Sequence, residues 1–389
     1  MNKKPLTILN IGLDRDLLSR DTRTEAQTRQ LFYARSLPAR LVHIVKAPHS
    51  APRTPIELDE SLSIVPCPVR HWSQFIPAAI RLGAGLLHRE SFDLIQVQEP
   101  FVSGLAGAIL ARRFRTPLVV GLYSDEIDNP AWLSERPLNR LANRLGKWVL
   151  RQAAAVRSDS LAVAERLSHY GLRHLTYFPF LITHADKLLA LDAGTQATRL
   201  RLLDGQDGPL LLAVCRLEKE KNIQLMLSAF ANAARQYPGL VLAIAGDGSL
   251  ANTLAQEAER IVPGRVRWLG WVGNTEMPAF YQAADLMLLS SNRESAARVL
   301  YETLLAGTPA LSTDTAGARE VIENDVTGHI VPVGDLAAFT QALIELCSST
   351  DRLAEMGREG RRRMSSRVTA EAVTRQMRAV YEKVLERTD

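Results

Sequence analysis

The stretch from Asp285 to Ser312 reads DLMLLSSNRESAARVLYETLLAGTPALS, and its pattern predicts a strand, a helix and a second strand in succession. The apolar run Leu286–Leu289 has the length of a buried strand, and apolar residues then recur at helical spacing over residues 296–306. The tripeptide Gly-Thr-Pro at 307–309 ends the helix, and a new apolar run follows. Strands joined by a helix in this way run parallel in one sheet.

The same alternation of short apolar runs and amphipathic segments continues along the chain. It predicts an α/β fold with two Rossmann-like domains, each built on a parallel sheet of about six strands covered on both faces by helices. The strand candidates are Leu6–Ile11, Leu41–Val45, Leu62–Val65, Leu94–Val97, Leu118–Leu122 and Leu175–Phe178 in the first half, and Leu210–Val214, Leu240–Ala245, Val266–Leu269, Leu286–Leu289, Pro309–Ser312 and Ile330–Val331 in the second.

A chain of 389 residues is long for a single domain. The region from His184 to Pro209 is rich in turn residues, so we place an N-terminal domain at residues 1–190 and a C-terminal domain at residues 191–365. Residues 366–389 end in a helical run with no strand after it. This helix either caps its own domain or crosses back to the first one.

Charge and composition narrow the range of functions. Residues 1–190 hold 25 Lys and Arg against 17 Asp and Glu, whereas residues 191–389 hold 22 against 25. The basic first half favours an anionic partner or a membrane face, although a solvated surface explains the same excess. The three cysteines lack metal-binding spacing, and no apolar run approaches the roughly 18 residues of a membrane span. We therefore expect a cytoplasmic protein.

Two cations and two carboxylates in the second half indicate a nucleotide-sugar site. Arg216 and Lys221 follow a predicted strand, at the sheet edge that faces the ligand crevice in such folds. Guanidinium and ammonium groups bind diphosphate oxygens. Glu294 and Glu302 flank the start of the helix described above, and their carboxylates can accept hydrogen bonds from sugar hydroxyls. A solvated loop and ordinary surface glutamates are the alternative interpretation.

Gly246-Asp247-Gly248 follows another strand and begins a G-x-G-x-x-A pattern, which formally matches a dinucleotide-binding fingerprint. That fingerprint requires an acidic residue at the end of the next strand to bind the ribose. The next strand ends in Trp268–Val272 with no acid, so we exclude a nicotinamide dehydrogenase. Gly246 would still permit close approach of the backbone to a ligand.

Taken together, these motifs resemble those of the retaining family-4 glycosyltransferases of the GT-B fold. Their donor domain carries G-R-L-x-x-x-K, then G-x-G, a D-x-x-x-x-x-S strand, E-x7-E and A-x-G-x-P. The resemblance is strong over residues 205–365 and weak in the first half. The matching segments, in the family's order, are Cys215–Lys221, Gly246–Gly248, Asp285–Ser291, Glu294–Glu302 and Ala306–Pro309.

The resemblance implies a role for each matching residue and a GT-B arrangement of two domains across a cleft. Arg216 and Lys221 would bind the donor diphosphate and stabilise the leaving group, Glu294 would hold the donor sugar, and Glu302 would hold the ribose. No metal and no cofactor is implied. The remaining donor contacts, mostly through backbone atoms, would come from Gly246, Val272, Ser295, Ala296, Ala297, Arg298 and Val299.

Two departures from the family lie near the donor site. The family usually has Gly-Phe-Gly after the first glutamate, whereas residues 295–297 are Ser-Ala-Ala; their N–H groups at the start of a helix would still form an anion cradle. Arg298 stands where the family has an apolar residue. It either points to solvent, which we favour, or pairs with an anionic donor sugar such as a uronic acid.

The first half departs further. The family often has a histidine after the strand equivalent to residues 117–122, but this chain has Tyr123. Gly12, Tyr123 and Asp125 become the candidates for acceptor binding. Asp14-Arg15-Asp16 resembles the D-x-D of metal-dependent transferases, but it lies at the wrong end of the chain, and we interpret it as a loop.

Two segments of the first half have the pattern of basic amphipathic helices, Trp72–Leu87 and Leu138–Val149. Such helices can lie on an anionic membrane, although a domain helix with a basic outer face has the same pattern. We accordingly expect the protein to lie in the cytoplasm, with peripheral binding at the inner face of the membrane as one outcome.

The sequence thus predicts a metal-independent retaining glycosyltransferase that moves a sugar from a nucleotide diphosphate to a glycan or lipid-linked acceptor, in surface polysaccharide or glycolipid synthesis. The alternative is a non-catalytic partner that binds a nucleotide sugar or glycan. Nucleic-acid binding is disfavoured because the basic residues are not interleaved with aromatics.

Overall fold

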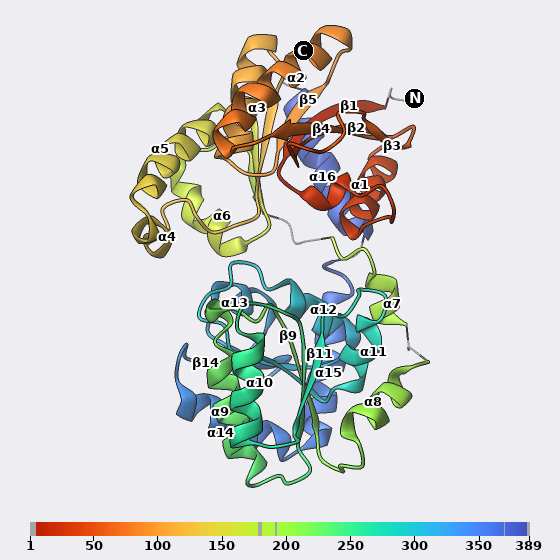
Figure 1. The fold of residues 1–389 in the computed structure, drawn as a ribbon, viewed down its shortest axis with the longest axis vertical. Coiled ribbons are helices and arrows are strands. Elements are labelled where there is room, and N and C mark those ends of the chain that lie inside the picture. The colour runs from red at the N-terminus through yellow and green to blue at the C-terminus, as the bar shows by residue number, and fades with distance from the viewer. Residues whose placement is uncertain (1–4, 178–180, 191–192, 369, 387–389) are drawn as a thin grey trace. The chain divides into compact units, whose positions relative to one another are not determined.

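The computed structural model describes residues 5–177, 181–190, 193–368 and 370–386, and the chain forms two compact units (Figure 1). One unit comprises residues 1–183 and 370–389, and the other comprises residues 184–369. The boundary therefore lies seven residues before the one expected from the turns. The reason is the short helix α7 (Ala185–Leu189), whose Leu188 is buried and whose Leu188 carbonyl accepts a hydrogen bond from Gln282 of the second unit.

The second unit has a six-stranded parallel sheet in the order β11-β10-β9-β12-β13-β14. This is the strand order of a Rossmann-type sheet. Strands β10 and β11 are added on one side of β9, and the chain then crosses over to add β12, β13 and β14 on the other side, so the switch point lies between β9 and β12. Each strand predicted in this half is present. The strands are β9 (Leu210–Val214), β10 (Val241–Ala245), β11 (Val266–Gly270), β12 (Leu286–Leu289), β13 (Ala310–Thr313) and β14 (Gly328–Val331).

Helices cover both faces of this sheet. Leu211 and Ala213 of β9 and Ile244 of β10 pack in one apolar cluster with Phe230 of α9 and Phe339 of α14. Successive strand residues point to opposite faces, so the neighbouring positions face the other helices. The helices of this unit are α7, α8 (Thr195–Leu203), η4 (Lys219–Lys221), α9 (Ile223–Ala234), α10 (Ala251–Ile261), α11 (Met277–Ala283), α12 (Arg298–Ala306), α13 (Ala316–Val321), α14 (Leu336–Cys347) and α15 (Thr350–Met364).

The first unit has an eight-stranded sheet in the order β3-β4-β2-β1-β5-β6-β7-β8, in which only the edge strand β3 is antiparallel to its neighbour among the described pairs. The sequence pattern missed two of these strands, β3 and β7, because both are short and carry charged residues. The expected strand end at Phe178 lies outside the described residues. The strands are β1 (Leu6–Gly12), β2 (Ala39–Pro48), β3 (Ile56–Asp59), β4 (Leu62–Val69), β5 (Leu94–Val97), β6 (Leu118–Leu122), β7 (Ala155–Ser158) and β8 (Leu175–Tyr177).

The C-terminal helix α16 (Ala370–Leu385) belongs to the first unit, where it lies beside α1 and β1 (Figure 1). Val373 and Val380 are buried in the same cluster as Leu31 of α1, and Tyr381 donates a hydrogen bond to Gln96 of β5. The other helices of this unit are η1 (Arg15–Leu18), α1 (Glu25–Ser36), η2 (Trp72–Gln74), α2 (Phe75–Arg89), α3 (Val102–Phe114), α4 (Pro130–Glu135), α5 (Pro137–Gln152), α6 (Leu161–Leu167) and η3 (Ser168–Tyr170).

No helix in the described parts of the chain combines the length and the apolar character needed to cross a lipid bilayer.

Candidate functional site

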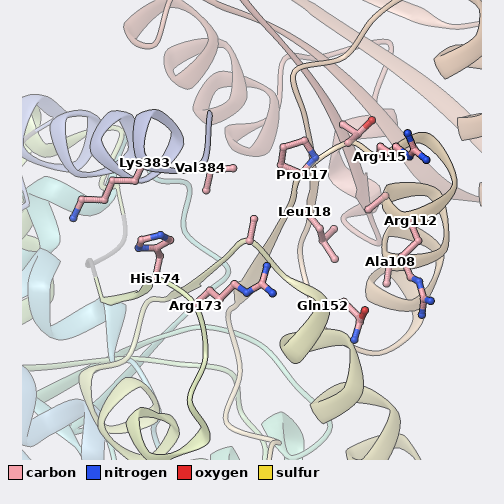
Figure 2. A pocket seen from close by; sticks show the side chains of 13 residues that line it. Ala108, Arg112, Arg115, Pro117, Leu118, Gln152, Arg173, His174, Lys383 and Val384 are labelled. Carbon is pink, nitrogen blue, oxygen red and sulfur yellow. The ribbon is translucent and has the colours of Figure 1, made fainter. Parts of the chain in front are cut away.

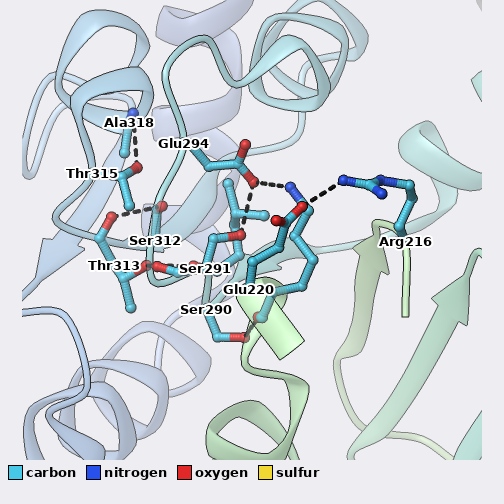
Figure 3. Close-up of polar contacts among 11 residues, drawn as sticks. Arg216, Glu220, Ser290, Ser291, Glu294, Ser312, Thr313, Thr315 and Ala318 are labelled. Atoms are coloured by element: carbon cyan, nitrogen blue, oxygen red, sulfur yellow. Dashed lines mark hydrogen bonds and ion pairs between the residues drawn. The ribbon is translucent and has the colours of Figure 1, made fainter. Parts of the chain in front are cut away.

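The loops after β9 and β12 are bonded to each other at the carboxyl edge of the second sheet. The two strands are parallel neighbours, so their carboxyl ends lie together. Ser290 donates its hydroxyl hydrogen bond to the carbonyl oxygens of Lys221 and Asn222, at 2.9 and 3.0 Å, and the Asn292 N–H donates to the Glu220 carbonyl oxygen at 2.8 Å. This junction holds the charged residues of both loops in fixed positions (Figure 3).

Lys221 and Glu294 form an ion pair across this junction, with 2.6 Å between Nζ and Oε1. Both side chains are only 14% exposed, so the pair is largely shielded from water. Ser291 also donates a hydrogen bond to Glu294 Oε1, at 2.8 Å (Figure 3). Among the described residues no donor reaches Glu294 Oε2, so this oxygen remains able to accept a hydrogen bond from a ligand hydroxyl.

Arg216 lies near the start of the same loop, two residues after the end of β9. Its side chain is 70% exposed and pairs with Glu220, four residues later, at 2.5 Å (Figure 3). An exposed pair of this kind contributes little to stability, about 0–1 kcal/mol, so Arg216 can leave Glu220 for a stronger anion at small cost. The neighbouring Glu218 accepts hydrogen bonds from the N–H and hydroxyl of Ser249, which ties this loop to the one after β10.

Gly246 and Gly248 allow the loop after β10 to cross the loop after β9 at close range. Gly246 has φ +138°, and a Cβ placed on it would lie 2.9 Å from the Cys215 carbonyl carbon and closer still to its oxygen. A Cβ on Gly248 would lie 2.5 Å from the Leu217 carbonyl oxygen. The glycines thus serve the contact between two protein loops, and Gly246 also lines the pocket described below.

Glu302 lies within α12 and is contacted by three side chains from different parts of the unit. Tyr281 of α11 donates its hydroxyl hydrogen bond to Oε2 at 2.9 Å, Arg298 donates from Nε to Oε1 at 2.8 Å, and His184 Nε2 lies 3.7 Å from Oε1. Burial and the neighbouring carboxylate raise the pKa of Tyr281 well above its usual value, so this phenol remains a hydrogen-bond donor.

Arg298 was expected to point to solvent, and this expectation is wrong. Its side chain is only 28% exposed because the i, i+4 spacing on α12 directs it to Glu302. The orientation of the Glu302 carboxylate is therefore set from both sides, by Arg298 and by Tyr281.

A pocket of about 270 Å³ brings together residues from several of these loops. It unites four of the residues expected to bind the donor: Arg216, Gly246, Val272 and Glu302. Trp271 also lines it and is 80% exposed, which makes its indole a flat apolar surface at the pocket's rim. Cys215 lies in the wall; burial raises the pKa of its thiol to about 12, so it remains protonated and is not a nucleophile.

The small residues 295–297 form a loop before α12, which begins at Arg298, two residues later than expected. Among the described residues, the N–H groups of Ser295, Ala296 and Ala297 have no protein acceptor. Val299 lies in the first turn of the helix, where N–H groups have no partner within the helix. The Arg298 N–H, at one of the positions expected to contact the donor through backbone atoms, instead donates to the Ala296 carbonyl oxygen at 3.0 Å.

The three acceptor candidates belong to the first unit. Gly12 ends β1, where a Cβ would collide with the Gln98 side chain, and Tyr123 follows β6 with 37% of its surface exposed. Asp125 forms an ion pair with Arg166, so its carboxylate is already engaged. Asp14, in the segment interpreted as a loop, caps the short helix η1 and pairs with Arg29.

Sequence reasoning missed His184, Trp271 and Tyr281. His184 and Tyr281 reach Glu302 from 118 and 21 residues away along the chain, and no local pattern signals such contacts. The sequence shows Trp271 next to Val272, but it does not show that the indole is exposed at a pocket.

Comparison with known proteins identifies the class. A model described as "Glycosyl transferases group 1" matches residues 197–363, and one described as "Glycosyl transferase 4-like domain" matches residues 25–180. The chain belongs to the group 1 glycosyltransferases, and its two Rossmann-like units are those of the GT-B fold.

The individual relatives share only about a quarter of their aligned residues with this chain. The chain is 26% identical over 238 residues to the lipopolysaccharide core biosynthesis glycosyltransferase LpsE of Rhizobium meliloti, covering 60% of this chain and 66% of that protein. It is 27% identical over 267 residues to the alpha-monoglucosyldiacylglycerol synthase of Streptococcus pneumoniae, covering 65% and 59%. The matches thus span about six tenths to two thirds of the length of these curated relatives.

Solved structures share the fold at low identity. Sucrose-phosphate synthase from Thermosynechococcus elongatus superposes with a TM-score of 0.82 at 20% identity, covering 98% of this chain and all of that one. Anabaena HepE in complex with UDP-glucose gives a TM-score of 0.72 at 19% identity, covering 96% and 98%.

Proposed function

We propose that the protein is a retaining glycosyltransferase that moves a sugar from a nucleoside diphosphate to a glycan or lipid-linked acceptor. The observation that carries this proposal is the Lys221–Glu294 pair on a loop whose Arg216 lines a pocket together with Glu302. Cations, carboxylates that can accept hydrogen bonds from sugar hydroxyls, and a concave surface thus lie together at the switch point of a Rossmann-type sheet.

In this proposal the donor lies along the loop junction. Its ribose diol binds Glu302, its base lies against Val272 and Trp271, and its diphosphate meets Arg216, Lys221 and the free N–H groups before α12. The donor sugar binds Glu294 through Oε2. The placement is supported by the pocket that Arg216, Val272, Trp271 and Glu302 line together and, among the described residues, by the unfilled Oε2 of Glu294 and the N–H groups before α12 without a protein acceptor.

The chemistry follows from where charge develops. As the bond between the anomeric carbon and the diphosphate breaks, negative charge grows on the leaving diphosphate, and fixed cations there stabilise the transition state more than the ground state. In a front-face reaction the acceptor oxygen bonds to the same face of the sugar, and its proton passes to the departing phosphate oxygen. Arg216 and Lys221 then carry the charge that a metal ion carries in other transferases.

The relatives support a setting in cell-surface or glycolipid synthesis. LpsE is named for lipopolysaccharide core biosynthesis, and the pneumococcal relative is named for a glycosylated diacylglycerol. Several HepE structures contain UDP or UDP-glucose. We accordingly propose UDP-sugars as the first donors to test, with glycan and glycolipid acceptors.

The test is nucleotide release measured with UDP-, GDP-, ADP- and dTDP-sugars, with and without an acceptor extract. Acceptor-dependent release from one donor, with the anomeric configuration of the product determined by NMR, supports the proposal. Binding of a donor in thermal-shift measurements without release under any condition would favour the non-catalytic alternative.

The variant Glu302→Gln should weaken donor binding by about 10- to 100-fold, because a charge-assisted hydrogen bond to the ribose contributes roughly 1.5–3 kcal/mol. Glutamine keeps the shape and can still accept from Tyr281. Calorimetric titration with UDP measures the effect, and Glu276→Gln, at an exposed position of the same unit, serves as the control. Unchanged UDP affinity in Glu302→Gln would refute the ribose assignment.

We also propose that α5 binds an anionic membrane surface. Leu138, Leu141 and Leu145 are 73%, 54% and 41% exposed, and Arg140 and Arg144 lie exposed on the same helix. An exposed apolar stripe beside basic residues matches a bilayer interface with anionic headgroups. The other amphipathic candidate, Trp72–Leu87, presents one such side chain, Trp72 of η2, which is 54% exposed; within α2 itself no described large apolar side chain is exposed to this extent.

The variant Leu138→Gln/Leu141→Gln should reduce binding to phosphatidylglycerol vesicles by about tenfold or more, since each buried leucine contributes roughly 1.5–3 kcal/mol. Vesicle co-sedimentation measures this, and Leu200→Gln, at a leucine of the other unit that is 62% exposed, is the matched control. If the wild-type chain does not sediment with anionic vesicles, the membrane proposal fails.

A further inference from the structure

A second pocket lies wholly within the first unit, at the amino-terminal edge of its sheet (Figure 2). It has a volume of about 270 Å³ and is bordered by Leu118, Ala154 and His174, which stand at or just before the first residues of β6, β7 and β8. Tyr123 follows the opposite end of β6. Five residues at ~3.3 Å each place the two edges roughly 16 Å apart. The proposed transfer reaction uses nothing at this edge.

Basic residues from separate parts of the chain line this pocket. Arg112 and Arg115 come from the end of α3, Arg173 and His174 from the turn before β8, and Lys383 from α16 (Figure 2). No aspartate or glutamate is among the described residues that line it. Within the described parts of the chain, none of the three arginines and Lys383 forms an ion pair, although many other arginines of this protein do.

A helix-end explanation accounts for Arg112, Arg115 and Lys383, but not for Arg173 and His174. Basic residues at the end of a helix interact favourably with its dipole; Arg112 and Lys383 lie in the last turns of α3 and α16, and Arg115 is the C-cap of α3. Arg115, at the αL C-cap of α3, and His174 both adopt positive φ, 53° and 42°, a conformation that is uncommon for residues other than glycine. Both line the pocket, so two backbone positions that favour glycine hold basic side chains at one site.

We propose that this basic pocket binds a phosphate-bearing ligand. Guanidinium groups bind phosphate through paired N–H donors, and Lys383 adds a point charge on another side. Three arginines and a lysine without an opposing carboxylate match a group with two or more negative charges, such as a diphosphate or a phosphate monoester. The source is either a soluble phosphorylated molecule or a lipid headgroup, and the chemistry of recognition is the same.

The test must separate this pocket from the proposed donor site, which also binds phosphate. Calorimetric titration with pyrophosphate is therefore done on an Arg216→Gln/Lys221→Met/Glu294→Gln background, which leaves no unpaired charge at the Lys221–Glu294 position. On that background we expect binding to persist, and we expect Arg115→Gln/Arg173→Gln to weaken it by about tenfold or more. The control Arg113→Gln/Arg151→Gln removes the same charge from neighbouring exposed residues that do not line the pocket, and it should change the affinity less than about twofold.

Hydrogen exchange of the wild-type chain gives a second readout that does not depend on folding of the variants. Pyrophosphate should slow exchange over residues 112–118 and 173–177. Flotation with phosphatidic acid vesicles, whose headgroup is a phosphate monoester, tests the lipid source on the Leu138→Gln/Leu141→Gln background. If the parent protein binds pyrophosphate and the pocket variant does not, the ligand is a soluble molecule. If the parent protein binds vesicles but not pyrophosphate, and the pocket variant binds neither, the ligand is a lipid headgroup. Equal binding by pocket and control variants, or no binding in either assay, overturns the proposal.

Discussion

Replacing Lys221 with alanine is expected to lower kcat by about 10²–10³-fold, the range found when one preorganised group that stabilises transition-state charge is removed. Lys221 is the more deeply placed of the two cations, because its side chain is 14% exposed whereas that of Arg216 is 70% exposed. In the proposed reaction its charge is therefore less screened by water than that of Arg216. Nucleotide release at saturating donor measures the effect.

The Lys221 variant also leaves Glu294 without its ion-pair partner, which costs stability and complicates the interpretation. The double variant Lys221→Met/Glu294→Gln removes both charges together and should fold at least as well as Lys221→Ala. Arg216→Ala should slow transfer with little loss of stability, since its partner Glu220 is itself 38% exposed. If Lys221→Ala and Arg216→Ala both turn over at the wild-type rate, neither cation stabilises the leaving group, and the proposed function loses its main support.

Replacing Gly246 with alanine is expected to lower the free energy of unfolding of the second unit by about 3 kcal/mol or more, combining backbone strain with overpacking. Gly246 has φ +138°, which L side chains rarely adopt, and the new Cβ would collide with the Cys215 carbonyl group. That carbonyl belongs to the loop that carries Arg216 and Lys221, so donor binding should be lost as well.

Gly264→Ala is the matched control for this prediction. Gly264 also has positive φ, +67°, but no atom lies within 4 Å of the position that a Cβ would take there, so only the strain contribution of roughly 1–2 kcal/mol remains. Urea unfolding followed by tryptophan fluorescence, with five tryptophans in the chain, compares the two variants. Equal destabilisation by both substitutions would show that the crossing of the two loops does not constrain Gly246.

Local periodicity was sufficient to predict most of the fold. All six strands of the second sheet were expected, because buried parallel strands are short continuous apolar runs separated by amphipathic helices. Strand β7 was missed because it has only four residues and includes Arg157, which is buried and lies over the rings of Tyr33 and Tyr123. A charged residue in a short run predicts a loop unless its tertiary partners are known.

The candidate site divides in the same way. The ion pair between Lys221 and Glu294 was not predicted, although their common position at one edge of the sheet could be, since parallel neighbouring strands deliver their following loops to one edge. The contacts of Glu302 could not be predicted, because Tyr281 and His184 reach it through helix packing. Arg298 was misjudged for the same reason: whether an arginine on a helix faces water depends on what covers that helix.

By itself, the sequence determined the class of fold, the order of the strands along the chain and the charged loops that follow β9 and β12. These follow from periodicity, turn chemistry and residue type, which are local properties. Only the tertiary structure decided which carboxylate pairs with which cation, that α16 packs on the first unit, and that five basic residues from three segments surround one pocket. Those features depend on side chains that are distant along the chain and close in space, and their burial sets the strength of each charge.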